Sequence, residues 1–159
     1  MIRVAEPDDL EDVFDLWREL LDYHQPLHRV FAYKPDQTQA LKAELLYRLK
    51  DRDTRVFAFV QEDEWQGLLV ASIRKAAPGF KLAHKGYIAE TVVREKYRGT
   101  GVGKELFEAA KKWLTDCGAD HLELQVSIRN TSGIRFWEAQ GFTISTQHMV
   151  LELPPARKK

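Results

Sequence analysis

The stretch that decides the fold runs from Val92 to Leu106 and reads VVREKYRGTGVGKEL. It predicts an apolar strand, a glycine-rich turn and the start of an amphipathic helix. Such a turn lets successive backbone N–H groups point at one place, and the helix dipole adds about half an elementary positive charge there. The stretch therefore predicts a site for a phosphate or pyrophosphate group.

Two common phosphate-binding loops do not fit this stretch. A Walker A loop requires a hydroxyl residue directly after its lysine, and Lys104 is followed by Glu105. A dinucleotide-binding fingerprint requires G-x-G-x-x-G, and neither possible frame has a glycine at the third position. The spacing that remains is Arg98-x-x-Gly101-x-Gly103.

The composition is that of an ordinary globular protein. The 159 residues suit one domain with one core, with 44% hydrophobic and 30% charged residues. Lys+Arg and Asp+Glu both number 24, so bulk charge does not favour nucleic acid or a membrane surface as a partner. The single cysteine excludes an internal disulfide and a cysteine-rich metal site. Without a membrane-spanning run or a signal-peptide pattern, we expect a cytoplasmic protein.

Periodicity predicts the elements on both sides of the decisive stretch. Their order is β-α-α-β-β-β-α-β-α-β, which indicates an α/β domain with a single mixed sheet. We expect one domain over residues 1–153 and a C-terminal tail over 154–159. The predicted strands lie at residues 1–5, 54–61, 67–73, 86–94, 121–127 and 142–153, and the helices begin at residues 7, near 41, 102 and 130.

Two motifs resemble the GCN5-related N-acetyltransferase (GNAT) family. The first is Val93-x-x-x-Tyr97-Arg98-Gly99-x-Gly101-x-Gly103, which is similar to the family's Arg/Gln-x-x-Gly-x-Gly/Ala loop. The second is Asn130-x-x-Gly133-x-x-Phe136-Trp137-x-x-x-Gly141-Phe142, which is similar to the family's Asn-x-x-Ala-x-x-(Phe/Leu)-Tyr-x-x-x-Gly-Phe segment. The order of elements is also the family's, so the resemblance covers nearly the whole chain. It implies the acyl-CoA N-acyltransferase fold, with a single mixed twisted sheet.

The resemblance implies an acetyl-CoA-dependent N-acetyltransferase that acts on a primary amine of a small molecule, amino acid, peptide or protein. No metal is implied. The pyrophosphate is expected on backbone amides of the loop, and the pantetheine arm is expected along the preceding strand end. The cofactor-binding residues that the resemblance implies are Val92, Val93, Arg98, Gly99, Thr100, Gly101, Val102, Gly103, Lys104, Asn130 and Gly133. Asn130 could equally cap the following helix.

Acetyl transfer to an amine also requires a base. An alkylamine with a pKa near ~10.4 is mostly protonated at neutral pH, so a general base must remove a proton. Glu90 is the leading candidate, because many GNAT members place a carboxylate on this strand and because a lone acid within an apolar segment is unusual. The histidines His24, His28 and His84 are alternatives, since histidine titrates near the working pH.

Trp137 departs from the family pattern, which commonly has tyrosine there as the acid that protonates the leaving thiolate. An indole N–H is a hydrogen-bond donor without a proton to give up, so Trp137 cannot be that acid. It shares a helix face with Ile134, and we expect it to be a core aromatic. Possible replacements for the acid are Tyr23, Tyr33 and Tyr87. The departure also leaves open a non-catalytic acetyl-CoA- or CoA-binding sensor or interaction domain of the same fold.

The amine acceptor is expected between two connections, His24–Asp36 and Arg74–Lys85. Both segments combine basic and aromatic residues, which would suit a carboxylated amine better than a polyamine. Family analogy also predicts a homodimer through the last strands. A plain nucleotide-binding module is a third class, and it predicts stabilisation by ATP or NAD rather than by coenzyme A.

Overall fold

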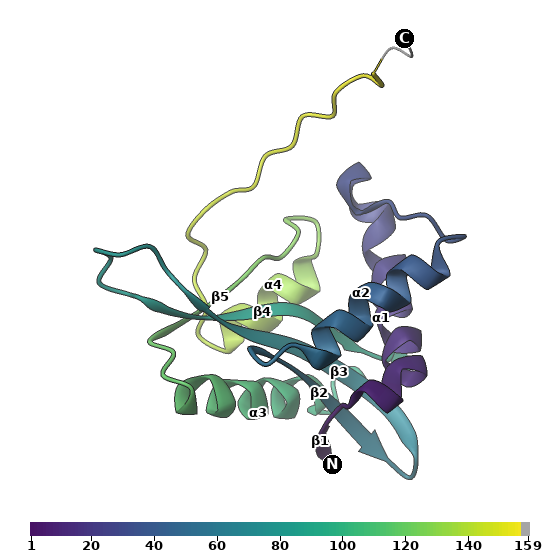
Figure 1. The fold of residues 1–159 in the computed structure, drawn as a ribbon, viewed down its shortest axis with the longest axis horizontal. Coiled ribbons are helices and arrows are strands. Elements are labelled where there is room, and N and C mark those ends of the chain that lie inside the picture. Colours follow the sequence, from purple (N-terminus) through teal and green to yellow (C-terminus); the bar gives the residue numbers. More distant parts are fainter. Residues whose placement is uncertain (157–159) are drawn as a thin grey trace.

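The computed structural model describes residues 1–156. Figure 1 shows one curved sheet with helices on both faces. The predicted α/β class and the predicted order of elements are confirmed as far as α4. The elements are β1 (Ile2–Val4), α1 (Leu10–His24), α2 (Thr38–Lys50), β2 (Thr54–Gln61), β3 (Glu64–Lys75), β4 (His84–Val93), α3 (Val102–Asp116), β5 (His121–Leu124) and α4 (Thr131–Ala139).

The sheet has the strand order β1-β2-β3-β4-β5. Neighbouring strands are antiparallel except for the parallel pair β4 and β5, so the predicted mixed sheet is confirmed. The parallel pairing covers only Lys85–Ile88 of β4 and His121–Leu124 of β5. Beyond Ile88, β4 therefore has β3 as its one strand neighbour within the described residues.

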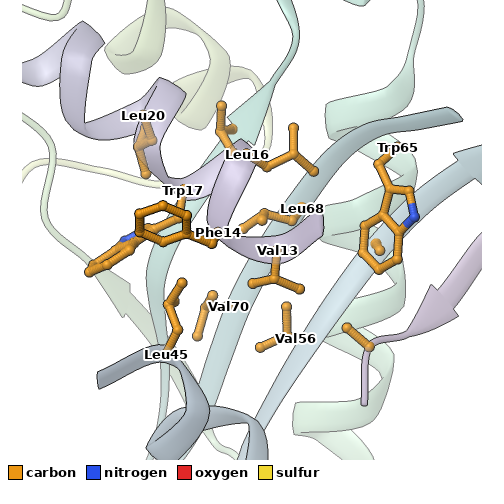
Figure 2. Close-up of a cluster of buried hydrophobic side chains, with 13 residues drawn as sticks. Val13, Phe14, Leu16, Trp17, Leu20, Leu45, Val56, Trp65, Leu68 and Val70 are labelled. Atoms are coloured by element: carbon orange, nitrogen blue, oxygen red, sulfur yellow. The ribbon is translucent and has the colours of Figure 1, made fainter. Parts of the chain in front are cut away.

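Each face of the sheet carries its own hydrophobic core. The apolar stripe of α1 and Leu45 of α2 cover one face, where they pack against Val56, Leu68 and Val70 of the sheet (Figure 2). The apolar stripe of α3, together with Trp137 of α4, covers the other face. The side chains that α1 buries are Val13, Phe14, Leu16, Trp17 and Leu20.

A β-bulge in β4 changes which side chains face which core. Val70 of β3 pairs with Glu90, but the next residue, Ala71, pairs with Ile88, so Ala89 is the extra residue. Ile88 packs in the core under α3, whereas Val92 packs in the core under α1 and α2. In a regular strand these two residues would share a face, because side chains alternate with a period of two. The bulge thus sets the direction of Glu90.

The predicted last strand over 142–153 is wrong: none of residues 142–156 lies in a helix or strand. This segment is an extended chain that leaves the body of the molecule (Figure 1). The alternation of its apolar residues is typical of a strand, but no edge is paired with it. Residues 157–159 of the predicted tail lie outside the described part of the chain. None of the described helices is long and apolar enough to cross a bilayer.

Candidate active site

The glycine-rich turn presents free backbone donors at the start of α3. Within the described part of the chain, residues 99–104 donate no backbone hydrogen bond of good geometry. The first three N–H groups of α3, those of residues 102–104, are free as in any helix. The N–H groups of residues 99–101 lie just before the helix and are additional free donors. Gly101 is the N-cap of α3 and has a left-handed φ of 95°. The turn can therefore surround an anion with several N–H groups, as predicted.

Two glycines of this turn have different surroundings. A Cβ atom built on Gly101 would meet no atom within 4 Å, so the space in front of the loop is open to a ligand. A Cβ on Gly103 would lie 3.3 Å from Cζ of Phe136, which belongs to α4. Gly103 therefore lets α3 approach α4 closely, in addition to the predicted role of its backbone.

The free edge of β4 begins beside this turn. Residues 90–93 pair with β3 on one side, and their other edge is not paired with β5. Such an edge offers N–H and C=O groups to an extended ligand, which can bind as an added strand. The predicted contact between the Val93 backbone and a pantetheine arm requires this opening. Arg98 extends along it and donates from Nε to the carbonyl of Val93 at 3.1 Å.

Asn130 caps α4. Its Oδ1 accepts a hydrogen bond from the Gly133 N–H at 3.0 Å, so the capping role is confirmed. Gly133 leaves room for this cap, because a Cβ there would lie 2.4 Å from Nδ2 of Asn130. Tyr23 of α1 reaches the same cap, donating from its hydroxyl to Oδ1 of Asn130 at 3.1 Å.

Glu90 lies in the layer between the sheet and the helices α1 and α2. Its Oε1 accepts a hydrogen bond from Nη1 of Arg48, and its side chain is 18% exposed. The other oxygen, Oε2, is buried and has no hydrogen-bond partner among the described residues. Nε1 of Trp17 is a second such atom, and the Trp17 ring lies 5.8 Å from the Arg48 guanidinium carbon. Buried polar atoms are normally paired, so these two unpaired atoms mark a place where a polar group of a ligand or a water molecule would be stabilised.

Arg48 was not predicted from the sequence. Burial opposes its charge, but attraction to Glu90 and the hydrogen bond that Arg48 donates to it outweigh burial, so the pKa of the guanidinium is raised. Nε of Arg48 also donates to Glu44 at 3.2 Å. A basic residue seven positions after Leu41 and three after Leu45, on the apolar face of the helix, was the available signal.

The two predicted acceptor connections do not meet. The connection after α1 lines one pocket of about 580 Å³ together with Val150 and Glu152. The connection between β3 and β4 lines another of about 730 Å³ together with His121 and Glu123. Figure 1 shows the two connections at opposite sides of the molecule. The expectation that both flank one acceptor site is therefore wrong.

The histidines named as alternative bases have other contacts. Nδ1 of His28 accepts a hydrogen bond from the Val30 N–H at 3.0 Å, and Nδ1 of His24 lies 3.1 Å from the carbonyl oxygen of Leu20. His84 begins β4 at the end remote from the glycine-rich turn. Within the described residues none of these rings hydrogen-bonds to Glu90 or the turn, which leaves Glu90 as the candidate base. Within residues 1–156, no group of acidic, histidine or cysteine side chains is placed to hold a metal ion.

A model of the acetyltransferase (GNAT) family matches residues 12–142 of the chain. The chain belongs to the GNAT acetyltransferase family. This confirms the family that the two motifs predicted. The matched range includes both motifs, the bulged strand β4 and Glu90.

Similar proteins agree with this family. The chain is 34% identical over 62 residues to the human N-alpha-acetyltransferase 30, a match that covers 39% of this chain and 17% of the human protein. The fission yeast protein of the same name, from Schizosaccharomyces pombe, is 31% identical over 58 residues, which is 36% of this chain and 39% of that protein. The chain thus spans well under two thirds of the curated relatives it matches.

Solved structures share the whole fold. The BH1408 protein from Bacillus halodurans, in a tetramutant form, has a TM-score of 0.85 and 24% identity, with 96% of this chain and 99% of that chain covered. The aminoglycoside N-acetyltransferase AAC(6')-Iy in complex with CoA has a TM-score of 0.73 and 21% identity, with 97% and 99% covered. At this identity the likeness establishes the GNAT fold alone.

The GNAT position that commonly carries tyrosine is a packed aromatic here. Trp137 is 9% exposed, and its ring lies within 5.6 Å of those of Phe107, Phe136 and Phe142. The prediction of a core aromatic is confirmed. Trp137 therefore holds α4 against α3 and leaves the role of acid to another group.

Among the three tyrosines predicted as replacements, Tyr23 alone contacts GNAT motif residues. Its ring lies 5.3 Å from the guanidinium carbon of Arg98, and its hydroxyl binds Asn130. Tyr33 donates to Asp22 instead, and this hydrogen bond raises the pKa of its phenol. Tyr87 lies under the guanidinium of Arg74 at 4.1 Å. Tyr23 thus extends from α1 and contacts one residue of each GNAT motif, Arg98 of the first and Asn130 of the second.

Proposed function

We propose that this chain transfers an acetyl group from acetyl-CoA to a primary amine of a small molecule, amino acid or peptide. The observation that carries the proposal is the row of free N–H groups over residues 99–104, which continues the unpaired edge of β4. An anionic group with an extended amide-containing arm fits such an arrangement, because the turn binds the charge and the strand edge binds the amides. We propose residues 1–153 as the one domain that performs this reaction.

We assign the proton-accepting atom to Oε2 of Glu90. Oε1 is held by Arg48, while Oε2 has no partner in the described residues and lies in the layer under α1 and α2. An amine that approaches from this layer can pass its proton to Oε2, directly or through water. When bound, acetyl-CoA supplies an acetyl thioester. The new bond joins the amine nitrogen to the acetyl carbon, the carbon–sulfur bond breaks, and a proton goes to the thiolate.

The acceptor is proposed as a class only. The position of Glu90 favours entry from the side of α1 and α2, where the connection after α1 carries Arg29 and Lys34 on the rim of its pocket. Glu152 lines the same pocket and pairs with Arg29, so Lys34 supplies the remaining positive charge, which favours an amine that also bears a carboxylate over a polycation. The similar structures include an aminoglycoside N-acetyltransferase, and an aminoglycoside is a polycation rather than a carboxylated amine. The same fold therefore does not determine the acceptor of this chain.

Thiol release tests the proposed function. The protein is incubated with acetyl-CoA and a panel of amines that includes amino acids, peptide N-termini and aminoglycosides, and free thiol is measured. We expect at least one amine to increase thiol release in proportion to enzyme, with the acetylated amine found by mass spectrometry. Tight acetyl-CoA binding without thiol release from any acceptor would instead support the sensor alternative. Stabilisation by ATP but not by coenzyme A would contradict both.

Replacement of Tyr23 by phenylalanine is expected to weaken acetyl-CoA binding about fivefold, with kcat nearly unchanged. The change removes one hydrogen bond to Asn130, and such a bond contributes about 1 kcal/mol. Replacement by alanine should weaken binding further, because the Arg98 guanidinium also loses the ring beside it. Steady-state kinetics over a range of acetyl-CoA concentrations measure both effects. A large fall in kcat for Tyr23→Phe, with unchanged KM, would identify Tyr23 as the proton donor instead.

A further inference from the structure

Residues 74–85 form a basic segment that has no part in the proposed reaction. They comprise the end of β3, its connection to β4 and the start of β4, and we call them the basic hairpin end. They include Arg74, Lys75, Lys81 and Lys85 but no acidic residue, in a chain with equal numbers of acidic and basic residues. Figure 1 shows this end of the hairpin projecting past the neighbouring strands. Positive charge is thus concentrated on one projecting part of the molecule.

The basic hairpin end is far from the candidate active site. His84 begins β4, and Val93 ends it beside the glycine-rich turn. Nine steps along a strand, at ~3.3 Å each, separate the two residues by about 30 Å. Exposed charges are screened over about 8 Å at physiological ionic strength, so these cations do not act on a ligand of the turn. Their role has to be sought at the hairpin end itself.

A hollow of about 730 Å³ is lined by the basic hairpin end and the start of β5. Its apolar lining consists of Phe80 and Leu82, which are 68% and 53% exposed, together with Ala76 and Ala77. Large apolar side chains that gather at such exposure are typical of a contact surface. Pockets of about 300–1,000 Å³ hold ligands larger than one amino-acid side chain, so the hollow can take a large side chain and the backbone beside it.

Hydrogen bonds fix the walls of this hollow. The Ala76 N–H donates to the carbonyl of Ala83 at 2.9 Å, and the Ala83 N–H donates to Oδ2 of Asp120 at 2.8 Å. The His121 ring lies between two carboxylates, with Nδ1 2.7 Å from Asp120 and Nε2 2.8 Å from Glu123. The connection and β5 are thus held together before any ligand binds, and a preformed surface loses less entropy on binding.

The charges around the hollow leave two cations without a partner. Glu123, the one acidic residue in the lining, pairs with Lys85 at 3.2 Å and with His121. Lys75 and Lys81 line the same hollow and form no ion pair within residues 1–156. Uncompensated cations beside exposed apolar side chains are complementary to a partner that carries acidic and apolar groups together.

We propose that the hollow docks an acidic peptide segment of a partner protein. The segment places one large apolar side chain against Phe80 and Leu82, and its neighbouring carboxylates lie near Lys75 and Lys81. A bilayer surface is a poorer match, because it is flat and would leave the hollow unfilled. Nucleic acid is a poorer match as well, because such sites stack successive bases on several Phe, Tyr or Trp rings and the lining has one, Phe80. The docking does not depend on acetyl transfer.

Fluorescence anisotropy with a peptide of defined composition tests the docking. The probe is a labelled nonapeptide with four acidic residues on each side of one phenylalanine, and a second probe has glycine in place of the phenylalanine. At physiological ionic strength we expect wild-type protein to bind the phenylalanine probe saturably and at least ~tenfold more tightly than the glycine probe, because a phenyl group leaves water. Phe80→Ser/Leu82→Ser should remove this difference. Lys75→Glu/Lys81→Glu should weaken the binding of both probes at least ~tenfold.

Lys111→Glu/Lys112→Glu is the matched control, because it makes the same change in net charge on exposed side chains of α3. It should bind the phenylalanine probe as the wild type does. Amide shifts caused by the probe in heteronuclear NMR should be confined to residues 75–85 and 121–123, and coenzyme A affinity should be unchanged in all three double variants. Absence of saturable binding, equal losses in the two lysine variants, or shifts elsewhere would overturn the proposal. Tighter binding to phosphatidylserine vesicles or to single-stranded DNA than to the probe would assign the surface to that partner and likewise overturn it.

Discussion

Replacement of Gly101 by valine is expected to weaken acetyl-CoA binding at least ~100-fold while the protein stays folded. A Cβ atom at Gly101 would meet no atom within 4 Å, and Gly101 lies in the middle of the free N–H groups of residues 99–104, where the pyrophosphate is proposed to lie. Branched carbon atoms at this position would keep the phosphate away from the backbone. Hydrogen bonds to charged groups contribute about 1.5–3 kcal/mol each, so the loss of two of them accounts for a change of this size.

Gly79 provides a matched control for the strain of the same substitution. Its φ is 96°, against 95° for Gly101, and a Cβ built on it also meets no atom within 4 Å. It lies in the connection between β3 and β4, outside the proposed site. Gly79→Val and Gly101→Val should therefore lose similar stability, about 1–3 kcal/mol from left-handed backbone strain. Only the change at Gly101 should affect binding.

Isothermal titration calorimetry with coenzyme A and thermal unfolding of both variants measure the two quantities separately. Equal coenzyme A affinity for the Gly101 and Gly79 variants would show that the turn does not bind the pyrophosphate. In that case the proposed function would lose its main support, whatever the fold.

The sequence predicted best what depends on neighbouring residues. The strand, turn and helix over residues 92–106 follow from local periodicity and glycine placement, and all three are present. The N-cap at Asn130 depends on a donor three residues later and was likewise predicted. Trp137 was expected in the core because it lies on the apolar face of its helix.

The contacts that complete the site join residues far apart in the sequence. Arg48 and Glu90 are 42 residues apart, and Tyr23 and Asn130 are 107 apart. The bulge at Ala89 depends on how β3 and β4 pair, which no feature of β4 alone reveals. The prediction of a last strand over residues 142–153 was wrong for a related reason. Alternating apolar residues indicate that a segment can form a strand, but they do not show whether a sheet edge is available to pair with it. Met149, Leu151 and Leu153 have the required alternation and remain exposed.

The second large effect is expected for Glu90→Gln, which should lower kcat about 100-fold to 10,000-fold with acetyl-CoA affinity unchanged. This is the usual contribution of a positioned general base. Glutamine has nearly the same shape as glutamate, and its carbonyl oxygen can still accept a hydrogen bond from Arg48 in the place of Oε1. What it loses is the ability of the buried Oε2 position to take up a proton.

Glu44→Gln is the matched control, because Glu44 is the second carboxylate bound to Arg48. Its side chain is 55% exposed on α2, and it lies outside the strand that leads to the glycine-rich turn. If Glu90 only neutralises Arg48, the two glutamine variants should differ little in kcat, and any loss should follow the loss of stability. If Glu90 removes the amine proton, only the Glu90→Gln variant should have a low rate of acetyl transfer at saturating acceptor. Raising the pH should partly restore that rate, because the amine is then deprotonated in solution. Single-turnover measurements between pH 7 and pH 10 separate the two cases, since a purely structural role gives Glu90→Gln and Glu44→Gln the same pH profile.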